Sequence, residues 1–133
     1  MNFFMITPRS SDPLFQGKRQ IVEKVSNHCG IKVHYSTGYP VYSDQDSQQS
    51  AALLQNSDFC IADLSYERPS CYFETGLAQC KGKPIDLIAQ AGTTIHQVFN
   101  RDGVKFFKDL SDYETLIATI ITSRIDQLHE NKT

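Results

Sequence analysis

Short apolar segments alternate with longer amphipathic ones along the chain, and this alternation restricts the fold more than any other feature. The apolar segments span residues 2–7, 31–35, 58–63, 84–89 and 104–107. Their length and their flanking turn residues are typical of buried β-strands. The segments between them carry apolar side chains at helical spacing. Because strands and helices alternate, we expect an α/β protein with a parallel sheet and helices on both faces.

Helix signals between the strands agree with this interpretation. Asp12 is a good N-cap and Pro13 a good first helical residue, and Gly30 is placed to end the same helix. Ser111 or Asp112 is expected to cap the last helix. Further helices are predicted over residues 46–56, 70–81 and, as a short turn, 93–99, and a loop is predicted over residues 37–42.

Five strands connected in this way most often form a doubly wound parallel sheet with the order 2-1-3-4-5. Ligands of such sheets bind beyond the carboxyl ends of the strands, where the strand order reverses. Here the reversal falls between the first and the third strand. The loops at residues 7–12 and 63–74 flank that point and are the predicted site.

Composition excludes several classes of function. The chain has 133 residues, and we expect one domain over residues 1–129 with a short tail at 130–133. The net charge is −2, so no basic excess favours a nucleic acid or an anionic membrane. No apolar run approaches the roughly 18 residues of a membrane span. We expect a cytosolic protein that binds a small molecule.

No cofactor or metal is expected from the motifs. The four cysteines form no C-x-x-C pair, and the four histidines form no cluster. Free thiols in a reducing compartment are the better interpretation of these cysteines. Neither the G-x-G-x-x-G nor the Walker A pattern of nucleotide-binding loops is present.

The loop after the third strand holds two carboxylates at which we expect the chemistry. Asp63 ends the strand, and Glu74 lies near the start of the next helix. The positive end of a helix favours an ionised carboxylate, which can attack or stabilise an oxocarbenium-like sugar carbon. The small residues Gly76 and Ala78 would let this helix approach the sheet closely. A purely structural alternative stays open for each acid: Asp63 as a loop brace, and Glu74 as a residue favoured near a helix start.

The loop after the first strand is suited to an anion. Thr7, Arg9 and Ser10 supply hydroxyls and a guanidinium before a helix N-terminus, where a phosphate can bind. The alternative is a capping turn with a solvated arginine. In the other loop, Ser70 is a further candidate for substrate binding, and Tyr72 is placed either to stack on a base or to pack in the core.

Three segments together resemble the nucleoside 2-deoxyribosyltransferase family, which includes nucleotide N-glycosidases. They are Ile61-Ala-Asp-Leu-Ser65, Pro69-Ser-Cys-Tyr-Phe-Glu-Thr-Gly-Leu-Ala78 and Gly82-Lys-Pro84. By this resemblance, Glu74 is the nucleophile on the anomeric carbon of a nucleoside or nucleoside monophosphate, and water or a second base then takes the sugar. Family members commonly complete their pockets with a neighbouring subunit, so the resemblance also implies a homo-oligomer.

One departure from the family concerns its second carboxylate. That residue usually lies in the helix before the third strand, where this chain reads Ser47-Gln-Gln-Ser50. The nearest acids are Asp44 and Asp46, and we take Asp46 as the candidate for contacting the substrate. Hydrolase and transferase activities both remain open.

A second resemblance leads to a different substrate. Cys71-Tyr-Phe-Glu74 resembles the C-x-x-E motif of Toll/interleukin-receptor (TIR) domains, some of which cleave NAD at its nicotinamide ribosyl bond. This resemblance implies a TIR-like NAD hydrolase or cyclase. A non-catalytic nucleotide-binding module is the third possibility.

Overall fold

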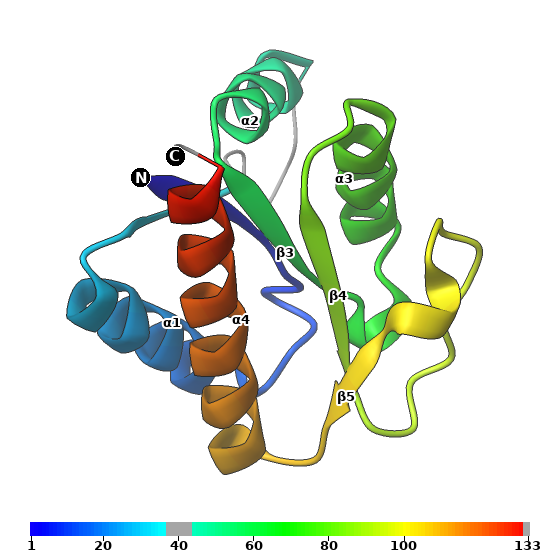
Figure 1. The fold of residues 1–133 in the computed structure, drawn as a ribbon. Coiled ribbons are helices and arrows are strands. Elements are labelled where there is room, and N and C mark those ends of the chain that lie inside the picture. The colour runs from blue at the N-terminus through cyan, green and yellow to red at the C-terminus, as the bar shows by residue number, and fades with distance from the viewer. Residues whose placement is uncertain (37–43, 132–133) are drawn as a thin grey trace.

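Five strands form a single parallel sheet in the computed structural model, which describes residues 1–36 and 44–131 (Figure 1). The order β2-β1-β3-β4-β5 confirms the predicted topology. The strands are β1 (Asn2–Ile6), β2 (Lys32–Tyr35), β3 (Phe59–Asp63), β4 (Ile85–Gln90) and β5 (Lys105–Phe107). The helices are α1 (Phe15–Cys29), α2 (Asp44–Gln55), α3 (Pro69–Cys80) and α4 (Leu110–Glu130). The predicted loop at residues 37–42 lies outside the described residues.

Helices cover both faces of the sheet, so both faces are buried. Successive side chains of a strand point to opposite faces and therefore enter different cores. In β1, Phe3 and Met5 belong to the core under α1 and α4, whereas Phe4 and Ile6 belong to the core under α2 and α3. Strand β3 is split in the same way, and its Phe59 ring stacks on Phe3 with the ring centroids 5.1 Å apart. Double burial explains why these strands are continuously apolar in sequence.

Helix α1 begins two residues later than the Asp12–Pro13 signal predicts. Asp12 accepts a hydrogen bond from the Leu14 backbone N–H at 2.8 Å, and the helix starts at Phe15. The second carboxylate oxygen of Asp12 accepts from Lys18, as described below. Gly30 ends the helix in the left-handed conformation, as expected.

The short helix predicted over residues 93–99 is absent, and this prediction is wrong. Side chains of α3 satisfy the backbone of this segment, so it needs no helical hydrogen bonds. Tyr72 accepts from the His96 backbone N–H at 2.8 Å. Gln79 bonds both the N–H and the carbonyl of Phe99. A 3₁₀ turn follows at Arg101–Gly103.

The cap of α4 also differs from the prediction. The carboxylate of Asp109 accepts from the Asp112 backbone N–H at 2.8 Å, so Asp109 caps the helix in place of Ser111 or Asp112. Within residues 1–36 and 44–131, no helix is long and apolar enough to cross a membrane.

Candidate functional site

The site lies where β1 and β3, neighbours at the reversal of strand order, reach their carboxyl ends. The loop after β1 leads into α1, and the loop after β3 passes through a 3₁₀ turn (Ser65–Glu67) into α3. Tyr66 and Glu67 have φ angles of 65° and 53°. Consecutive left-handed residues other than glycine are strained, and such strain concentrates at functional loops.

Glu74 projects from the second turn of α3 and is 7% exposed. The helix begins at Pro69, one residue before the predicted start, so Glu74 is its sixth residue. Its partner is Ser36, whose hydroxyl lies 2.8 Å from Oε1 and 2.6 Å from Oε2. Ser36 directly follows β2, so the carboxylate is held from another strand of the sheet.

Burial and these contacts have opposite effects on the acidity of Glu74. Removal from water raises the pKa of the carboxyl above its ordinary value of 4.5. The hydrogen bond from Ser36 and the charge of Arg9 oppose that rise. The ionised form is therefore supported by Ser36 and Arg9, in place of the helix N-terminus that the sequence suggested.

Arg9 completes a chain of contacts that leads to Glu74. Its Nη2 donates to the Ser36 carbonyl oxygen at 2.7 Å. Its guanidinium lies over the rings of Phe15 and Tyr35, 5.9 Å and 5.6 Å from their centroids. The sequence singled out Arg9 but missed Ser36, because nothing in the local pattern links Ser36 to a residue 38 positions away.

A cavity of about 330 Å³ opens beside Glu74, between α2 and α3. Most of its described wall is apolar, and Glu74 is the only ionisable side chain among the described residues that line it. The lining residues are Ser50, Ala51, Leu54, Pro69, Ser70, Phe73, Glu74 and Leu77. An apolar cavity with a single buried carboxylate suits a flat, uncharged ring system next to a reactive centre.

A second cavity of about 430 Å³ lies between the loop after β1, the start of α1 and the end of β2. Arg9 and Arg19 line it, together with the aromatic rings of Phe15 and Tyr35. The Tyr35 hydroxyl is buried and has no hydrogen-bond partner among the described residues. Asp12 also lines this cavity, but its carboxylate pairs with Lys18, so the two guanidinium groups make this cavity the more cationic of the two. Arg9 connects it to Ser36.

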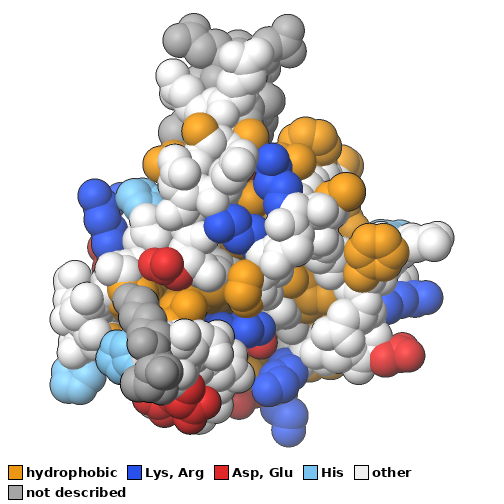
Figure 2. All heavy atoms as spheres, turned by 45° about the horizontal axis from the view of Figure 1, so that its top comes forward, with side chains coloured by type: hydrophobic (Ala, Val, Ile, Leu, Met, Phe, Trp, Pro, Cys, Tyr) orange, Lys and Arg blue, Asp and Glu red, His pale blue; other side chains and the backbone are white. Residues whose placement is uncertain are grey.

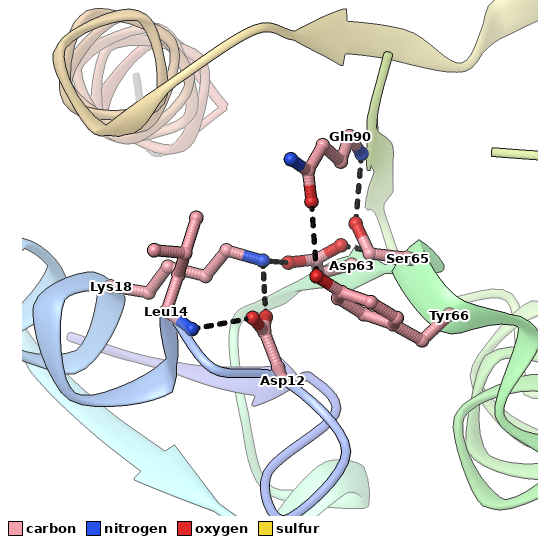
Figure 3. A network of polar contacts seen from close by, with 7 residues as sticks. All are labelled: Asp12, Leu14, Lys18, Asp63, Ser65, Tyr66 and Gln90. Atoms are coloured by element: carbon pink, nitrogen blue, oxygen red, sulfur yellow. Dashed lines mark hydrogen bonds and ion pairs between the residues drawn. The ribbon is translucent and has the colours of Figure 1, made fainter. Parts of the chain in front are cut away.

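Asp63 occupies a different environment, in a buried triad with Asp12 and Lys18 (Figure 3). Lys18 Nζ contacts Oδ2 of both carboxylates, at 2.8 Å from Asp63 and 2.5 Å from Asp12. The other Asp63 oxygen accepts from the Ser65 backbone N–H, and Ser65 Oγ accepts from the Gln90 N–H. Both Asp63 oxygens are thus used within the scaffold, and the triad ties together the two loops of the site.

The remaining predicted site residues lie in different surroundings. Ser70 lines the cavity beside Glu74. Ser10 is exposed, and Thr7 buries its hydroxyl without a partner among the described residues. Tyr72 turns its hydroxyl toward the segment at residues 93–99 and does not line the cavity. The side chain of Asp46 lies outside what the structure describes.

The small size of Gly76 does not serve the close contact between helix and sheet that the sequence suggested, because this residue does not face the sheet. A Cβ atom added there would meet nothing within 4 Å, and the residue is exposed. Ala78 is fully buried and belongs to the core between α3 and the sheet.

The structure also locates the cysteines and part of the charged surface. No group of three metal-ligating side chains occurs among the side chains described, those of residues 1–36 and 48–131. All four cysteines are free, and burial raises the pKa of the Cys60 and Cys71 thiols to about 12. On the face shown in Figure 2, the Lys and Arg side chains are scattered among hydrophobic patches rather than gathered in one stripe.

Comparison with known proteins identifies relatives by structure alone. No family model and no characterised protein match the sequence. A 2-deoxyribosyltransferase from Bacillus psychrosaccharolyticus superposes with a TM-score of 0.64 at 17% identity, covering 86% of this chain and 90% of that one. A 2-deoxyribosyltransferase from Leishmania mexicana gives 0.59 at 17% identity, covering 79% and 81%. The Clostridium botulinum CMP N-glycosidase BcmB gives 0.61 at 14% identity, covering 88% and 98%. The chain thus has the fold of 2-deoxyribosyltransferases and of a CMP N-glycosidase.

Proposed function

We propose that this protein cleaves the N-glycosidic bond of a nucleoside or nucleoside monophosphate, with Glu74 as the nucleophile. The observation that carries the proposal is the buried carboxylate of Glu74 on the wall of an apolar cavity, at the edge of the sheet where such folds bind ligands. The fold shared with 2-deoxyribosyltransferases and an N-glycosidase supports the same reaction class.

In the proposed reaction, a Glu74 oxygen attacks the anomeric carbon as the bond from that carbon to the base nitrogen breaks. The bonding electrons leave with the base, which takes up a proton from solvent water. Water then hydrolyses the glycosyl ester, or a second base displaces Glu74, so the protein acts as a hydrolase or a transferase. The apolar cavity strengthens electrostatic interactions with the developing sugar cation because it excludes water.

The two cavities suggest where each part of the substrate binds. The cavity beside Glu74 suits the base and the sugar, with the Ser50 and Ser70 side chains on its wall. A phosphate would bind at Arg9, which with Arg19 lines the second cavity. Thr7 and Ser10 belong to the same loop as Arg9 and are proposed to assist there.

We also propose that a second copy of the chain covers the mouth of the cavity. Phe73 lines the cavity and yet is 63% exposed, so its ring is available to a partner. Size-exclusion chromatography with light scattering tests this expectation, and Phe73→Ser should shift the protein toward the monomer.

Base release is the direct test of the reaction. The native protein, Glu74→Gln and the matched control Glu67→Gln are incubated with nucleosides, deoxynucleoside monophosphates and NAD, and products are separated by chromatography. Glu67 is an exposed acid of the same loop that pairs with His96. We expect free base from the native protein and the control but none from Glu74→Gln.

Other outcomes would redirect the assignment. Turnover that survives in Glu74→Gln would contradict the nucleophile. Nicotinamide release from NAD alone would favour the TIR-like activity. Nucleotide binding without any product would favour the non-catalytic module.

A further inference from the structure

We infer that Ser36 is the positioning residue of Glu74: its hydroxyl fixes the carboxylate plane and supports the ionised form that the reaction requires. The catalytic meaning of this inference rests on the function proposed above, but the contact itself can be tested without turnover.

The geometry of the contact explains the positioning. Ser36 Oγ lies 2.8 Å from one oxygen of Glu74 and 2.6 Å from the other. Both distances are in the range of a hydrogen bond between oxygens. Rotation of the carboxylate about its terminal bond would lengthen at least one of them, so the single hydroxyl restrains that rotation.

Ser36 is also the one hydrogen-bond partner of the Glu74 carboxylate among the described side chains, those of residues 1–36 and 48–131. On its other side the carboxylate borders a cavity whose described wall is mostly apolar. A hydrogen bond to an ionised group in such surroundings is stronger than a neutral one. Its removal would therefore change both the orientation and the acidity of Glu74.

The position of Ser36 is itself fixed by the first loop of the site. Arg9 donates to the Ser36 carbonyl oxygen at 2.7 Å, and aromatic rings of β2 and α1 flank the guanidinium. The chain of contacts therefore runs from the second cavity through Ser36 to the carboxylate. Arg9 acts on Glu74 both through its charge and through the backbone of Ser36.

The test uses Ser36→Ala, Ser36→Thr and the control Ser123→Ala, an exposed serine on α4. In protein labelled with ¹³C at the glutamate side-chain carboxyl, the Glu74 signal is assigned by its loss in Glu74→Gln. We expect Ser36→Ala to move the titration midpoint of Glu74 upward, and Ser36→Thr to restore it. Ser123→Ala should leave the midpoint unchanged.

Kinetics provide the second readout once a substrate has been found. Ser36→Ala should lower kcat about ten- to a hundredfold, as expected for the loss of a hydrogen bond to a charged group. KM should change much less, and the acidic limb of the pH profile should move in the same direction as the titration. Ser36→Thr should recover most of the rate.

The two readouts separate failure of this inference from failure of the proposed function. An unchanged Glu74 midpoint in a folded Ser36→Ala protein would overturn the inference, and so would an equal shift in Ser123→Ala. Absence of any turnover would instead count against the glycosidase assignment, while the titration would still decide the role of Ser36.

Discussion

Asp63 and Glu74 come from the same connection between β3 and α3, and both are buried, yet their surroundings differ. Asp63 is 0% exposed and shares the ammonium group of Lys18 with Asp12. Glu74 is 7% exposed, borders a cavity and is held by the hydroxyl of Ser36. The Asp63 carboxylate contacts a cation and accepts from one backbone N–H, whereas the Glu74 carboxylate has one neutral donor among the described residues and borders a cavity.

This contrast distinguishes a structural carboxylate from the one that we propose as the nucleophile. A buried ion pair gains little net stability, but loss of one partner leaves an uncompensated charge and is costly. A carboxylate kept with few partners pays in stability for its readiness to react with a ligand. We therefore expect substitutions in the triad to act on stability, and substitutions at Glu74 to act on chemistry.

Lys18→Met should produce the largest loss of stability. It leaves the carboxylates of Asp12 and Asp63 facing one another without a cation, which we expect to lower the free energy of unfolding by about 3–5 kcal/mol. Urea denaturation at pH 7 measures this change. The control is Lys24→Met, since Lys24 pairs with Glu114 at 2.7 Å but its side chain is 65% exposed.

Adding Asp12→Asn and Asp63→Asn to Lys18→Met should recover most of that loss, because the buried charges are then gone. A Lys18→Met protein as stable as the Lys24→Met control would show that the triad does not behave as a buried ion cluster.

Asp63→Asn alone should cost less, about 1–3 kcal/mol. Lys18 keeps Asp12 as its counter-ion, and an asparagine can still accept from the Ser65 N–H through its amide oxygen. The loss comes from one weakened contact to the ammonium group. Denaturation of the two single variants ranks their losses in free energy of unfolding. A larger loss for Asp63→Asn than for Lys18→Met would contradict the expectation that two uncompensated carboxylates cost more than one weakened contact.

The sequence predicted the fold well because its signal is local. The strands were recognised from continuous apolar runs such as Phe3–Ile6, which double burial requires. The strand order then followed from the most frequent topology for such alternation. By contrast, the helix predicted over residues 93–99 failed because Tyr72 and Gln79 of α3, distant in sequence, satisfy that backbone.

The site was only partly predictable for the same reason. Glu74 and Arg9 were singled out by residue type in loops flanking the reversal of strand order, and the structure brings both to Ser36, while their roles stay predictions. Lys18 looks like an ordinary helical lysine, and its partner Asp63 is 45 residues away. The contact of Ser36 with Glu74 likewise exists only because the end of β2 lies beside α3 in the fold. Contacts of this kind are created by tertiary packing and leave no periodic pattern in the sequence.

Glu74→Gln should change stability less than Asp63→Asn and in the opposite direction. Burial raises the pKa of Glu74 above 4.5, so the folded chain binds more protons than the unfolded chain between pH 4.5 and the folded pKa. The native protein therefore loses stability as the pH rises through that window. The glutamine variant does not titrate and lacks this loss. Its gain in free energy of unfolding over the native protein should therefore be absent below pH 4.5 and complete above the folded pKa.

Denaturation of the native and Glu74→Gln proteins at a series of pH values measures this difference. An advantage that grows toward acid pH would reverse the sign and show that the folded protein favours the ionised carboxylate over the protonated one.

Arg19→Met should have the smallest effect, and it isolates burial as the cause of the contrast. Arg19 follows Lys18 in α1 and pairs with Glu23 at 3.0 Å, a distance close to the 2.8 Å between Lys18 and Asp63. The side chains of Arg19 and Glu23 are 51% and 46% exposed, so water and salt screen their attraction. We expect a loss of at most about 0.5 kcal/mol, which should vanish in about 1 M salt, whereas the effect of Lys18→Met should persist there. If Arg19→Met proved as destabilising as Lys18→Met at both salt concentrations, pairing rather than burial would account for the behaviour of these charges.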